Sequence, residues 1–490
     1  MKGNLKSTTL ADIHLGVRIG GDAALLRGLI KVQLEMNSTN LDFIDKKTSG
    51  FDEMVNKATS TSWDNIVLDS GLNSEEIETA GKMLANSKAT IACWAMGLTQ
   101  HRNGVSVIQE VVNLLLLGGH VGRKGAGFCP VRGHSNVQGD RTVGIWEAPT
   151  EAFLDRMEEG LGFTVPRAHG LDVVHTIQAM SDDQIDFFFC MGGNFLSATP
   201  DTDLTARALS KIEMTVQVST KLNRSHLVTG KTAIILPCLG RTESDIQDKG
   251  EQFVTVENSM GIVHRSKGTL KPASSALKSE PWIVAEMAYA TLGDDHLEWR
   301  KLASNYNTIR DLMERSLHGF DNYNERVNRP NGFQLPNPPR DSQSFATPDG
   351  KAHFTTHNLP NLDVPRGHYV MMTLRSHDQY NTTIYGLSDR YRGVSGNRRI
   401  VFMNASDMVL RGWKSRTSVN ITSHFDGEQR HAKNWMVVPY DIPSGNIATY
   451  FPEANSLVPL HSTAEQSNTP TSKWIVCSLH SSTGPSHEEE

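Results

Sequence analysis

Cysteine is scarce in this sequence of 490 residues: there are five, and no two of them form a C-x-x-C pair. Zinc ribbons and the cysteine runs that hold iron–sulfur clusters depend on such pairs, so neither kind of metal site is expected in this chain. Single, scattered cysteines in a long chain indicate a reducing compartment, with the thiols buried in the core. The sequence therefore predicts a cytoplasmic protein.

Long apolar runs and an excess of positive charge are also absent. The most apolar stretch, residues 111–117, is flanked by polar residues, so no membrane span is expected. No apolar segment follows the start Met1–Lys6, and a secretory signal is therefore not predicted. With 48 basic against 54 acidic residues the formal net charge is -6, which argues against a general nucleic-acid-binding protein.

The stretch that organises the chain covers residues 93–139. The apolar run 89–96 predicts a strand, the polar segment 97–104 a loop, and residues 105–117 a helix that ends at a glycine pair. In such units the loop after the strand binds ligands, and glycines let backbone N–H groups approach a phosphate. Residues 130–139 form a second polar, glycine-rich cluster. Composition alone fits a ligand site and two ordinary surface loops equally well.

Up to residue 330, predicted helices alternate with short apolar strands, which favours α/β domains with parallel sheets. Asp22, which follows a glycine pair, is predicted to cap a helix over residues 23–33. The aromatic run 185–191 predicts a buried strand. Other expected elements are helices within residues 41–85, the last of them capped by Asn73, a helix from about Pro200 to Lys211, strands at 214–219, 233–236 and 253–256, and a helix at 281–292.

The C-terminal part of the chain has a different composition. Proline and asparagine crowd residues 331–367, which are predicted to form a linker. Residues 368–480 carry short β-rich runs separated by turn residues, which is typical of a small β-barrel. The tail 481–490 is expected to be disordered. The runs lie at 369–374, 399–403, 417–422, 435–439 and 474–478. We expect two α/β domains, at residues 1–139 and 140–330, before the barrel.

Five motifs, in this order, resemble the bis-molybdopterin-guanine-dinucleotide oxidoreductases. The nearest likeness is to their formate dehydrogenase alpha-subunit-like members, in the YdeP-type branch. The resemblance covers nearly all of residues 10–480, and five matches in the right order are far more specific than any one alone. The motifs are Trp94-Ala-Met-Gly97-Leu-Thr99-Gln100-His101, Pro130-Val-Arg132-Gly133-His134-Ser135-Asn136-Val-Gln138-Gly139, Met191-Gly192-Gly193-Asn194, Thr373-Leu-Arg375-Ser376-His377-Asp-Gln379-Tyr380 and Asn468-Thr-Pro-Thr-Ser-Lys473.

The resemblance implies a fold, a cofactor and a reaction. In that family two α/β domains each hold one pterin guanine dinucleotide, and a six-stranded β-barrel closes over both. The implied cofactor is molybdenum bis(molybdopterin guanine dinucleotide), with tungsten in some relatives. The metal takes two electrons from a small-molecule substrate, and a [4Fe–4S] cluster passes them to an electron-acceptor protein. A formate dehydrogenase-like oxidoreductase is the implied function.

Cofactor contacts are carried over from the family position by position. Arginine suits this task because its planar fork pairs two phosphate oxygens at once. The implied contacts are Gly21 and Asp22; Gly97, Thr99, Gln100 and His101; Asn136, Gln138 and Gly139; Gly192, Gly193 and Asn194; Ser219, Thr220 and Asn223; Arg375, Ser376, Gln379 and Tyr380; and Asn455 and Lys473. No residue of this chain, Cys129 included, is expected to ligate the metal.

Two residues are expected to act on the substrate. Arg132 resembles the active-site arginine of formate dehydrogenases, where a permanent cation anchors a carboxylate and stabilises developing charge. A salt bridge to a phosphate or an acidic side chain is the alternative. His134 stands where formate dehydrogenases usually have glutamine, which argues against formate itself as the substrate. Its imidazole is expected to relay a proton, with a structural hydrogen bond as the alternative.

The family's N-terminal portion, with the [4Fe–4S] cysteines and the molybdenum ligand, has no counterpart in this sequence. The resemblance therefore predicts a truncated chain, in which residues 1–139 are only the C-terminal part of the first α/β domain. Alone, such a chain is expected to expose half-sheets, bind cofactor poorly and lack turnover. Two other functions stay open. A non-catalytic relative that has lost the cofactor is disfavoured by the retained cations Arg132, Arg375 and Lys473. A nicotinamide-dependent dehydrogenase is disfavoured because neither glycine loop fits G-x-G-x-x-G.

Overall fold

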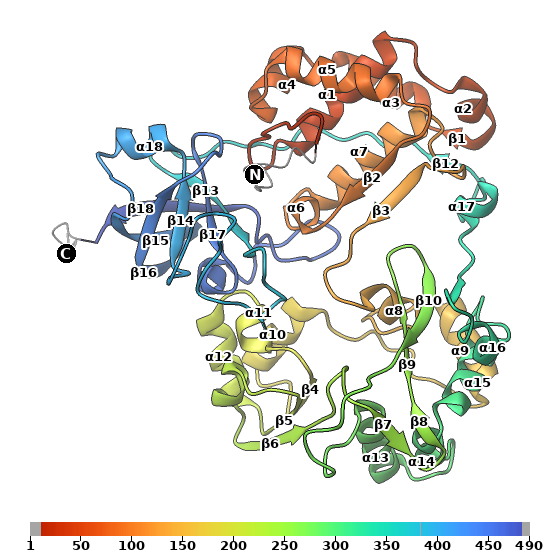
Figure 1. Cartoon of the computed structure of the whole chain (residues 1–490). Coiled ribbons are helices and arrows are strands. Elements are labelled where there is room, and N and C mark those ends of the chain that lie inside the picture. The colour runs from red at the N-terminus through yellow and green to blue at the C-terminus, as the bar shows by residue number, and fades with distance from the viewer. Residues whose placement is uncertain (1–10, 383, 483–490) are drawn as a thin grey trace. The chain divides into compact units, whose positions relative to one another are not determined.

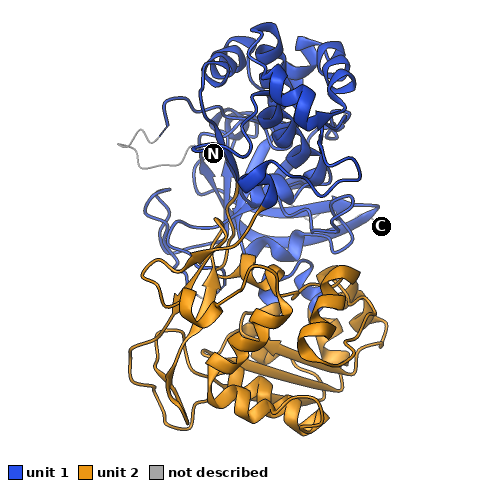
Figure 2. Ribbon diagram, turned by 90° about the vertical axis from the view of Figure 1, so that its right-hand side faces the viewer, with its two compact units in different colours: residues 1–128, 196–205, 338–490 blue, residues 129–195, 206–337 orange. Residues whose placement is uncertain are grey.

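The computed structural model describes residues 11–382 and 384–482 (Figure 1). The chain divides into two compact units (Figure 2). Unit 1 comprises residues 1–128, 196–205 and 338–490, and unit 2 comprises residues 129–195 and 206–337. Residues 1–10 and 483–490, on which the signal-sequence and tail predictions mostly fall, lie outside the described residues. In the part of the chain that the structure describes, no helix has the length and apolar character needed to cross a membrane.

The N-terminal part of unit 1 is a group of helices around one core. Helix α1 packs on α3, α4, α5 and α7. Ile30 of α1 and Leu117 of α7 are fully buried there. The elements are α1 (Asp22–Glu35), α2 (Leu41–Lys47), β1 (Thr48–Ser49), α3 (Phe51–Ser60), α4 (Trp63–Ser70), α5 (Ser74–Ala85), β2 (Ile91–Trp94), α6 (Met96–Thr99), α7 (Gly104–Leu117) and β3 (Gly127–Pro130). Strands β2 and β3 form a two-stranded sheet.

Of the two helix caps predicted from the sequence, one is confirmed and one is wrong. Asn73 caps α5 as predicted: its side chain accepts the N–H of Glu76, and the Glu76 carboxylate accepts the N–H of Asn73. The prediction of Asp22 as a cap is wrong, because Gly21 is the cap residue and Asp22 is the first residue of α1. A Cβ on Gly21 would lie 2.5 Å from the carbonyl oxygen of Asp69, so close backbone packing requires glycine at this turn.

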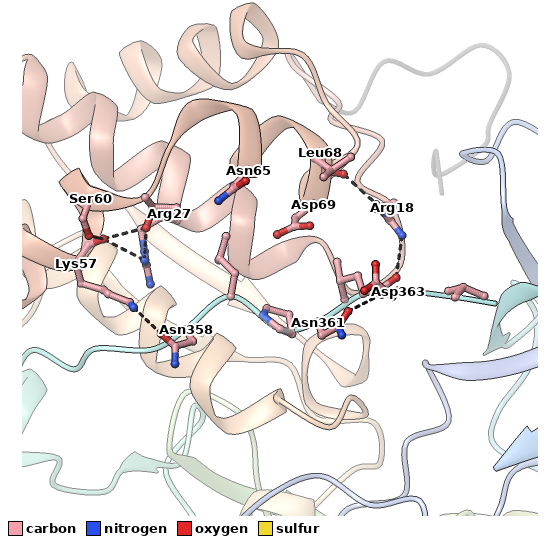
Figure 3. Close-up of a pocket in the computed structure, with 15 residues that line it drawn as sticks. Arg18, Arg27, Lys57, Ser60, Asn65, Leu68, Asp69, Asn358, Asn361 and Asp363 are labelled. Atoms are coloured by element: carbon pink, nitrogen blue, oxygen red, sulfur yellow. Dashed lines mark hydrogen bonds between the residues drawn. The ribbon is translucent and has the colours of Figure 1, made fainter. Parts of the chain in front are cut away.

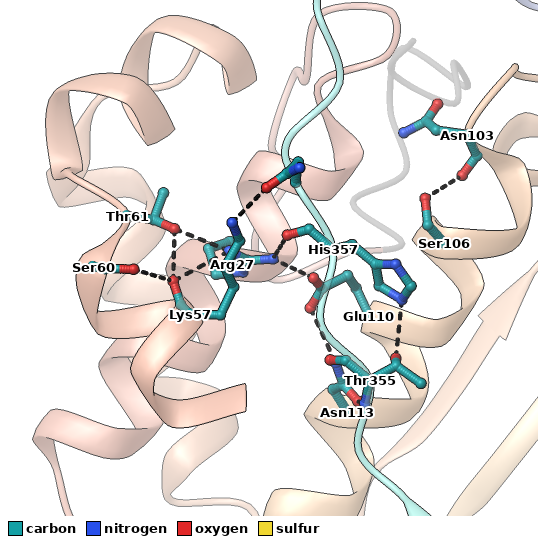
Figure 4. Close-up of polar contacts among 11 residues, drawn as sticks. Arg27, Lys57, Ser60, Thr61, Asn103, Ser106, Glu110, Asn113, Thr355 and His357 are labelled. Atoms are coloured by element: carbon teal, nitrogen blue, oxygen red, sulfur yellow. Dashed lines mark hydrogen bonds and ion pairs between the residues drawn. The ribbon is translucent and has the colours of Figure 1, made fainter. Parts of the chain in front are cut away.

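Residues 351–364, called the strap below, lie in the predicted linker but belong to unit 1, where they are hydrogen-bonded to its N-terminal part (Figure 4). Their first strand, β12 (Ala352–His353), pairs in parallel with β1. The Asn113 amide donates to the Thr355 carbonyl at 2.8 Å and accepts the Thr355 N–H at 3.0 Å. Arg27, which is paired with buried Glu110, donates to a carbonyl further along the strap. The sequence did not predict this ordered segment. Its hydrogen bonds are made to helices distant in the chain, and the segment itself has no periodic pattern.

Unit 2 contains the parallel sheet that the alternation of strands and helices predicts. Strands β4, β5 and β6 pair in parallel, in that order. The elements of the unit are α8 (Val137–Thr142), α9 (Glu151–Leu161), α10 (Val173–Ser181), β4 (Phe187–Met191), β5 (Met214–Ser219), η1 (Arg224–Leu227), β6 (Thr232–Pro237), β7 (Asp245–Gln247), β8 (Gly250–Gln252), β9 (Val254–Glu257), β10 (Ile262–Ser266), α13 (Glu280–Leu292), α14 (Trp299–Ser304), α15 (Tyr306–Ser316), α16 (Tyr323–Arg326) and β11 (Phe333–Gln334). Between β4 and β5 the chain forms α11 (Phe195–Ala198) and α12 (Thr202–Lys211).

Burial of the β4–β6 sheet differs from the prediction. Phe187 and Met191, at the two ends of β4, are 50% and 47% exposed, so the aromatic run is not a fully buried strand. On β6 the adjacent residues Ile234 and Ile235 are both exposed. Neighbouring residues of a strand point to opposite faces of a sheet. Both faces of β6 therefore lack a full apolar cover among the described residues.

The C-terminal part of unit 1 is a closed barrel with the strand order β13-β17-β14-β16-β15-β18. The sequence missed β17, which lies between β13 and β14 and is buried at every position, so it shows no alternating pattern. The predicted α/β fold with parallel sheets and a six-stranded barrel is confirmed. The elements are α17 (Pro338–Ser342), β13 (Tyr369–Leu374), β14 (Ile400–Met403), α18 (Ala405–Leu410), β15 (Ser418–Phe425), β16 (Glu428–Pro439), β17 (Asn446–Tyr450), η2 (Glu453–Leu457) and β18 (Ile475–Ser481).

Candidate functional site

The segment after β2 was predicted to be an open loop, but its first residues form the short helix α6. His101 follows this helix and is 5% exposed. Its Nε2 donates to the Gly97 carbonyl at 2.8 Å, so in the neutral ring Nδ1 is an acceptor. That Nδ1 is buried without a hydrogen-bond partner among the described residues. Burial, partly offset by the bond to Gly97, lowers the pKa of His101 to about 4.

The two glycines of this segment have different roles. A Cβ on Gly104 would lie 2.7 Å from the carbonyl oxygen of Thr99, so Gly104 allows α7 to start against that carbonyl. A Cβ on Gly97 would meet no atom within 4 Å. Gly104 is therefore explained by packing within the chain. Gly97 has no such explanation, and contact of a ligand with it stays a prediction.

The last motif of the chain lies against this segment. The N–H of Lys473 donates to the Gln100 carbonyl at 3.1 Å, and its Nζ donates to the Thr373 carbonyl. Burial and the nearby Arg375 guanidinium lower the pKa of Lys473 to about 8. Burial also lowers the pKa of Arg375, which lies over the Phe451 ring. Neither cation has an ion pair with a carboxylate among the described residues.

The first predicted contact, the turn at Gly20–Asp22, is also adjacent to this motif. Gly20 has a φ of +84°, and a Cβ there would lie 2.6 Å from the ring of Trp474. Burial raises the pKa of the Asp22 carboxyl to about 6. The fold of unit 1 therefore places predicted contacts near residues 21 and 100 against the last motif of the chain.

Three predicted contacts in the barrel are bonded within the protein. Arg398 is buried and donates to the Ser376 hydroxyl at 3.0 Å and to the Gln379 side-chain oxygen at 2.9 Å. Asn455 donates to a backbone carbonyl of α11 at 2.7 Å. Tyr380 is exposed. Cofactor contact by these residues stays a prediction. Arg398 was missed, because no local pattern distinguishes it from the other arginines nearby.

Two hollows in unit 1 are both lined by residues of the strap. The first, of about 700 Å³, is lined by residues 358–364 together with Arg18, Lys57 and Asp69 (Figure 3). The second, of about 870 Å³, is lined by residues 357–362 together with His101, His424 and Trp474. Of the predicted site residues, only His101 lines either hollow.

In unit 2, a glycine turn follows β4 at the carboxyl edge of the parallel sheet. Gly192 and Gly193 have φ values of +73° and +74°, a conformation that favours glycine. The Gly192 N–H donates to the Val218 carbonyl at 2.7 Å, which joins the turn to β5. A Cβ on Gly193 would meet no atom within 4 Å, so its backbone is open to an approaching oxygen.

Asparagines hold this turn in place. The Asn223 amide donates to the Gly193 carbonyl at 2.7 Å. The Asn194 side-chain oxygen accepts the Ser225 hydroxyl at 2.8 Å. The predicted contacts Asn194 and Asn223 thus lie together, and both shape the turn from within.

A histidine that the sequence missed links two further predicted residues. The Asn223 N–H donates to Nδ1 of His226 at 3.0 Å, so Nε2 carries the proton and donates to the Ser219 hydroxyl at 3.1 Å. Thr220 is exposed beside them. The usable signal was the position of His226 three residues after Asn223, which is the spacing of a capping box.

Arg132 and His134 line one pocket of about 290 Å³ in unit 2, called the Arg132 pocket below and formed by residues 132–136, residues 256–259 and His264. The Arg132 N–H donates to the Ser259 hydroxyl at 3.3 Å, and its Nε donates to the Gln138 side-chain oxygen at 3.1 Å. The bonded partner of the guanidinium is therefore a neutral amide rather than a carboxylate. His134, like Arg132, is exposed.

Two further predicted contacts shape the Arg132 pocket. Asn136 has a φ of +70°, and its side-chain oxygen accepts the N–H of Glu257 at 2.9 Å. A Cβ on Gly139 would lie 2.1 Å from that same oxygen, which explains the glycine. Glu257 was not predicted from the sequence, because it ends strand β9 outside the motifs.

Comparison with known proteins places the chain among oxidoreductases. The chain is 48% identical over 482 residues to an uncharacterized oxidoreductase of Mycobacterium tuberculosis, with 96% of this chain and 62% of the relative covered. It is 42% identical over 492 residues to Protein YdeP of Escherichia coli, with 97% and 65% covered. The F420-dependent formate dehydrogenase subunit alpha of Methanocaldococcus jannaschii is 26% identical over 314 residues, with 62% and 44% covered. The chain thus spans less than two thirds of the length of these relatives.

A solved structure agrees at the level of the fold. The acetylene hydratase from Pelobacter acetylenicus superposes with a TM-score of 0.66 at 15% sequence identity, covering 96% of this chain and 72% of that chain. The family model described as molybdopterin oxidoreductase matches residues 3–275. The likeness that the five motifs predicted is confirmed, and the chain belongs to the molybdopterin oxidoreductase family.

Proposed function

We propose that this chain is part of an enzyme that removes two electrons from a small anionic substrate, in the manner of formate dehydrogenases. The redox centre is molybdenum held by two pterin guanine dinucleotides. The observation that carries the proposal is the pair of neighbouring cations Lys473 and Arg375, which are both partly desolvated and have no carboxylate partner among the described residues. Desolvated cations without a counter-charge are costly, and a polyanionic ligand offsets that cost.

The described residues fit such a ligand in both units. In unit 1, Lys473 and Arg375 would hold phosphate or pterin oxygens, and the unpartnered Nδ1 of His101 offers an acceptor for a pterin N–H. In unit 2, the open left-handed turn at Gly192 and Gly193 would accept a phosphate oxygen at its backbone. We therefore assign one nucleotide to the cations of unit 1 and the other to the glycine turn of unit 2.

Within this proposal the chain positions the substrate and moves a proton. When bound, the molybdenum–pterin group supplies the two-electron acceptor. The guanidinium of Arg132 pairs with both oxygens of a carboxylate and fixes its orientation. His134, in the same pocket, accepts a proton and passes it to solvent, to which it is exposed. The similarity to a relative named as a formate dehydrogenase alpha subunit supports a carboxylate substrate.

Electron transfer needs groups beyond these residues. The five cysteines form no C-x-x-C pair, so they offer no ligand run for a [4Fe–4S] cluster. The proposal therefore assigns the [4Fe–4S] cluster to polypeptide outside this sequence, with an electron-acceptor protein as the partner. It also assigns the enzyme to the cytoplasm, where scattered thiols stay reduced.

The composition of the purified protein tests the cofactor. The 490-residue chain is expressed in a host that makes the molybdenum–pterin nucleotide, and its molybdenum and acid-released guanine are measured. We expect two guanines per molybdenum at any occupancy, because both nucleotides share one metal. Lys473→Gln should lower both contents severalfold, whereas Lys433→Gln, an exposed lysine of the same barrel, should not. Molybdenum without guanine, or equal contents in Lys473→Gln and Lys433→Gln, would contradict the proposal.

A further inference from the structure

The Arg132 pocket contains a carboxylate that the proposed function does not use. Glu257 lines the pocket and is only 6% exposed. Its Oε2 is buried and has no hydrogen-bond partner among the described residues. Buried polar atoms are almost always bonded, so an acceptor left open beside a pocket calls for a donor that a ligand brings.

The surroundings of Glu257 bear on its charge. Burial is the largest effect and raises the pKa of its carboxyl group above the usual value, and the Thr142 hydroxyl and the Arg132 guanidinium offset part of that rise. Both neighbours favour the ionised form, which can only accept hydrogen bonds. The imidazoles of His134 and His264 line the same pocket. A permanent cation and a carboxylate thus belong to one small pocket, with ring nitrogens around them.

The size of the pocket exceeds what formate fills. The cavity measures about 290 Å³. A water molecule in the liquid takes up about 30 Å³, so formate, with three heavy atoms, needs on the order of twice that volume. A formate ion paired with Arg132 would leave most of the space, including the side lined by Glu257, unfilled.

We propose that the Arg132 pocket binds a small carboxylate that also carries a hydrogen-bond donor, a 2-hydroxy acid being the simplest case. The carboxylate pairs with the guanidinium of Arg132, whose Nε is already held by Gln138. The hydroxyl donates to Oε2 of Glu257. The inference deepens the proposed function, because it names the class of substrate that the site takes.

Glycolate and acetate form a matched pair of probes, because they differ by one hydroxyl. Each is titrated into the full 490-residue chain and followed by ligand-observed NMR, which requires no turnover. We expect glycolate to bind at least about tenfold more tightly than acetate, since a hydrogen bond to a charged acceptor contributes about that much. In Glu257→Gln the preference should fall below about threefold. Glu159→Gln, the same change at an exposed position of α9, should keep it.

Each outcome decides the question. Equal affinities in the unaltered chain would overturn the role of Glu257, and no binding of either acid would overturn the pocket as an anion site. Because the first comparison uses the unaltered chain, a variant that fails to fold does not remove the test. A glycolate preference in protein whose molybdenum comes without guanine would keep this inference and reject the proposed cofactor. Protein that contains guanine and molybdenum but binds glycolate and acetate equally well would keep the proposed cofactor and reject this inference.

Discussion

The backbone N–H of Lys473 donates to the carbonyl oxygen of Gln100 at 3.1 Å, which joins the last motif of the chain to the segment after β2. The same lysine places its ammonium group beside Arg375, where burial and like charge oppose its protonation. Holding the cations of Lys473 and Arg375 close together therefore lowers the stability of the cofactor-free chain. Mutation of Lys473 can measure this cost.

Lys473→Met should stabilise the cofactor-free chain by about 1–2 kcal/mol at pH 7. Folding lowers the pKa of Lys473 from 10.5 to about 8, so the folded state disfavours the charged form. At pH 7 the lysine is charged in both states, and the wild type bears the full penalty, which disappears as the pH rises from 8 to 10.5. Urea unfolding at pH 7 and pH 9.5 measures this. A difference that does not shrink at the higher pH would contradict the explanation.

His101→Gln should make the chain less sensitive to acid. Folding lowers the pKa of His101 from 6.5 to about 4, so below pH 6.5 the unfolded state binds a proton that the folded state refuses. The wild type is therefore expected to lose about 2 kcal/mol of stability from this residue between pH 7 and pH 5. The variant should lack that loss in urea unfolding at the two pH values. His461→Gln, at an exposed position, is the control and should retain it.

Glu110→Ala should destabilise unit 1 by about 3–5 kcal/mol, because it leaves the buried Arg27 without its counter-charge. Replacing both partners, as in Arg27→Met with Glu110→Leu, should cost less than the single change. The exposed pair Glu78–Lys82 provides the comparison, and Glu78→Ala should cost less than about 1 kcal/mol. Thermal unfolding of the four proteins measures the effects. Equal losses for Glu110→Ala and Glu78→Ala would show that burial does not matter here.

Gly193→Ala should cost about 1–2 kcal/mol, because its φ of +74° is strained for alanine. Crowding does not contribute, since a Cβ there meets no atom within 4 Å. Gly97→Ala is a matched control: its Cβ also has open space, but its backbone is helical, so the change should be neutral or stabilising. Denaturant midpoints of the two variants separate backbone strain from contact. Similar midpoints would indicate that the turn after β4 relaxes.

Elements with a strong local pattern could be predicted from the sequence. The first barrel strand has the predicted bounds Tyr369–Leu374, and α7 differs from the predicted helix by one residue. Strand β17 and the strap were missed for a shared reason. Their order comes from pairing with segments distant in the chain, which leaves no periodicity in the residues themselves.

The candidate site follows the same division. Gly193 and Asn136 were recognisable because they belong to motifs that resemble the family, and both have the positive φ angles that glycine and asparagine adopt most readily. Arg398 and Glu257 could not be found, because nothing near them in the sequence sets them apart. Their importance comes from partners that only the folded chain brings near: the Ser376 hydroxyl for Arg398, and the Arg132 guanidinium for Glu257.

The strap has a practical consequence for dividing the chain into separately expressed pieces. The proline-rich composition of residues 331–367 suggests a boundary between expressed fragments just after residue 331. A cut there would strip α7 and β1 of their bonds to Thr355 and β12, and would expose the amide of Asn113, which is fully buried in the intact chain. An N-terminal fragment made in that way should aggregate and be sensitive to proteolysis. Adding the strap, residues 351–364, as a synthetic peptide should restore the resistance of the fragment to proteolysis.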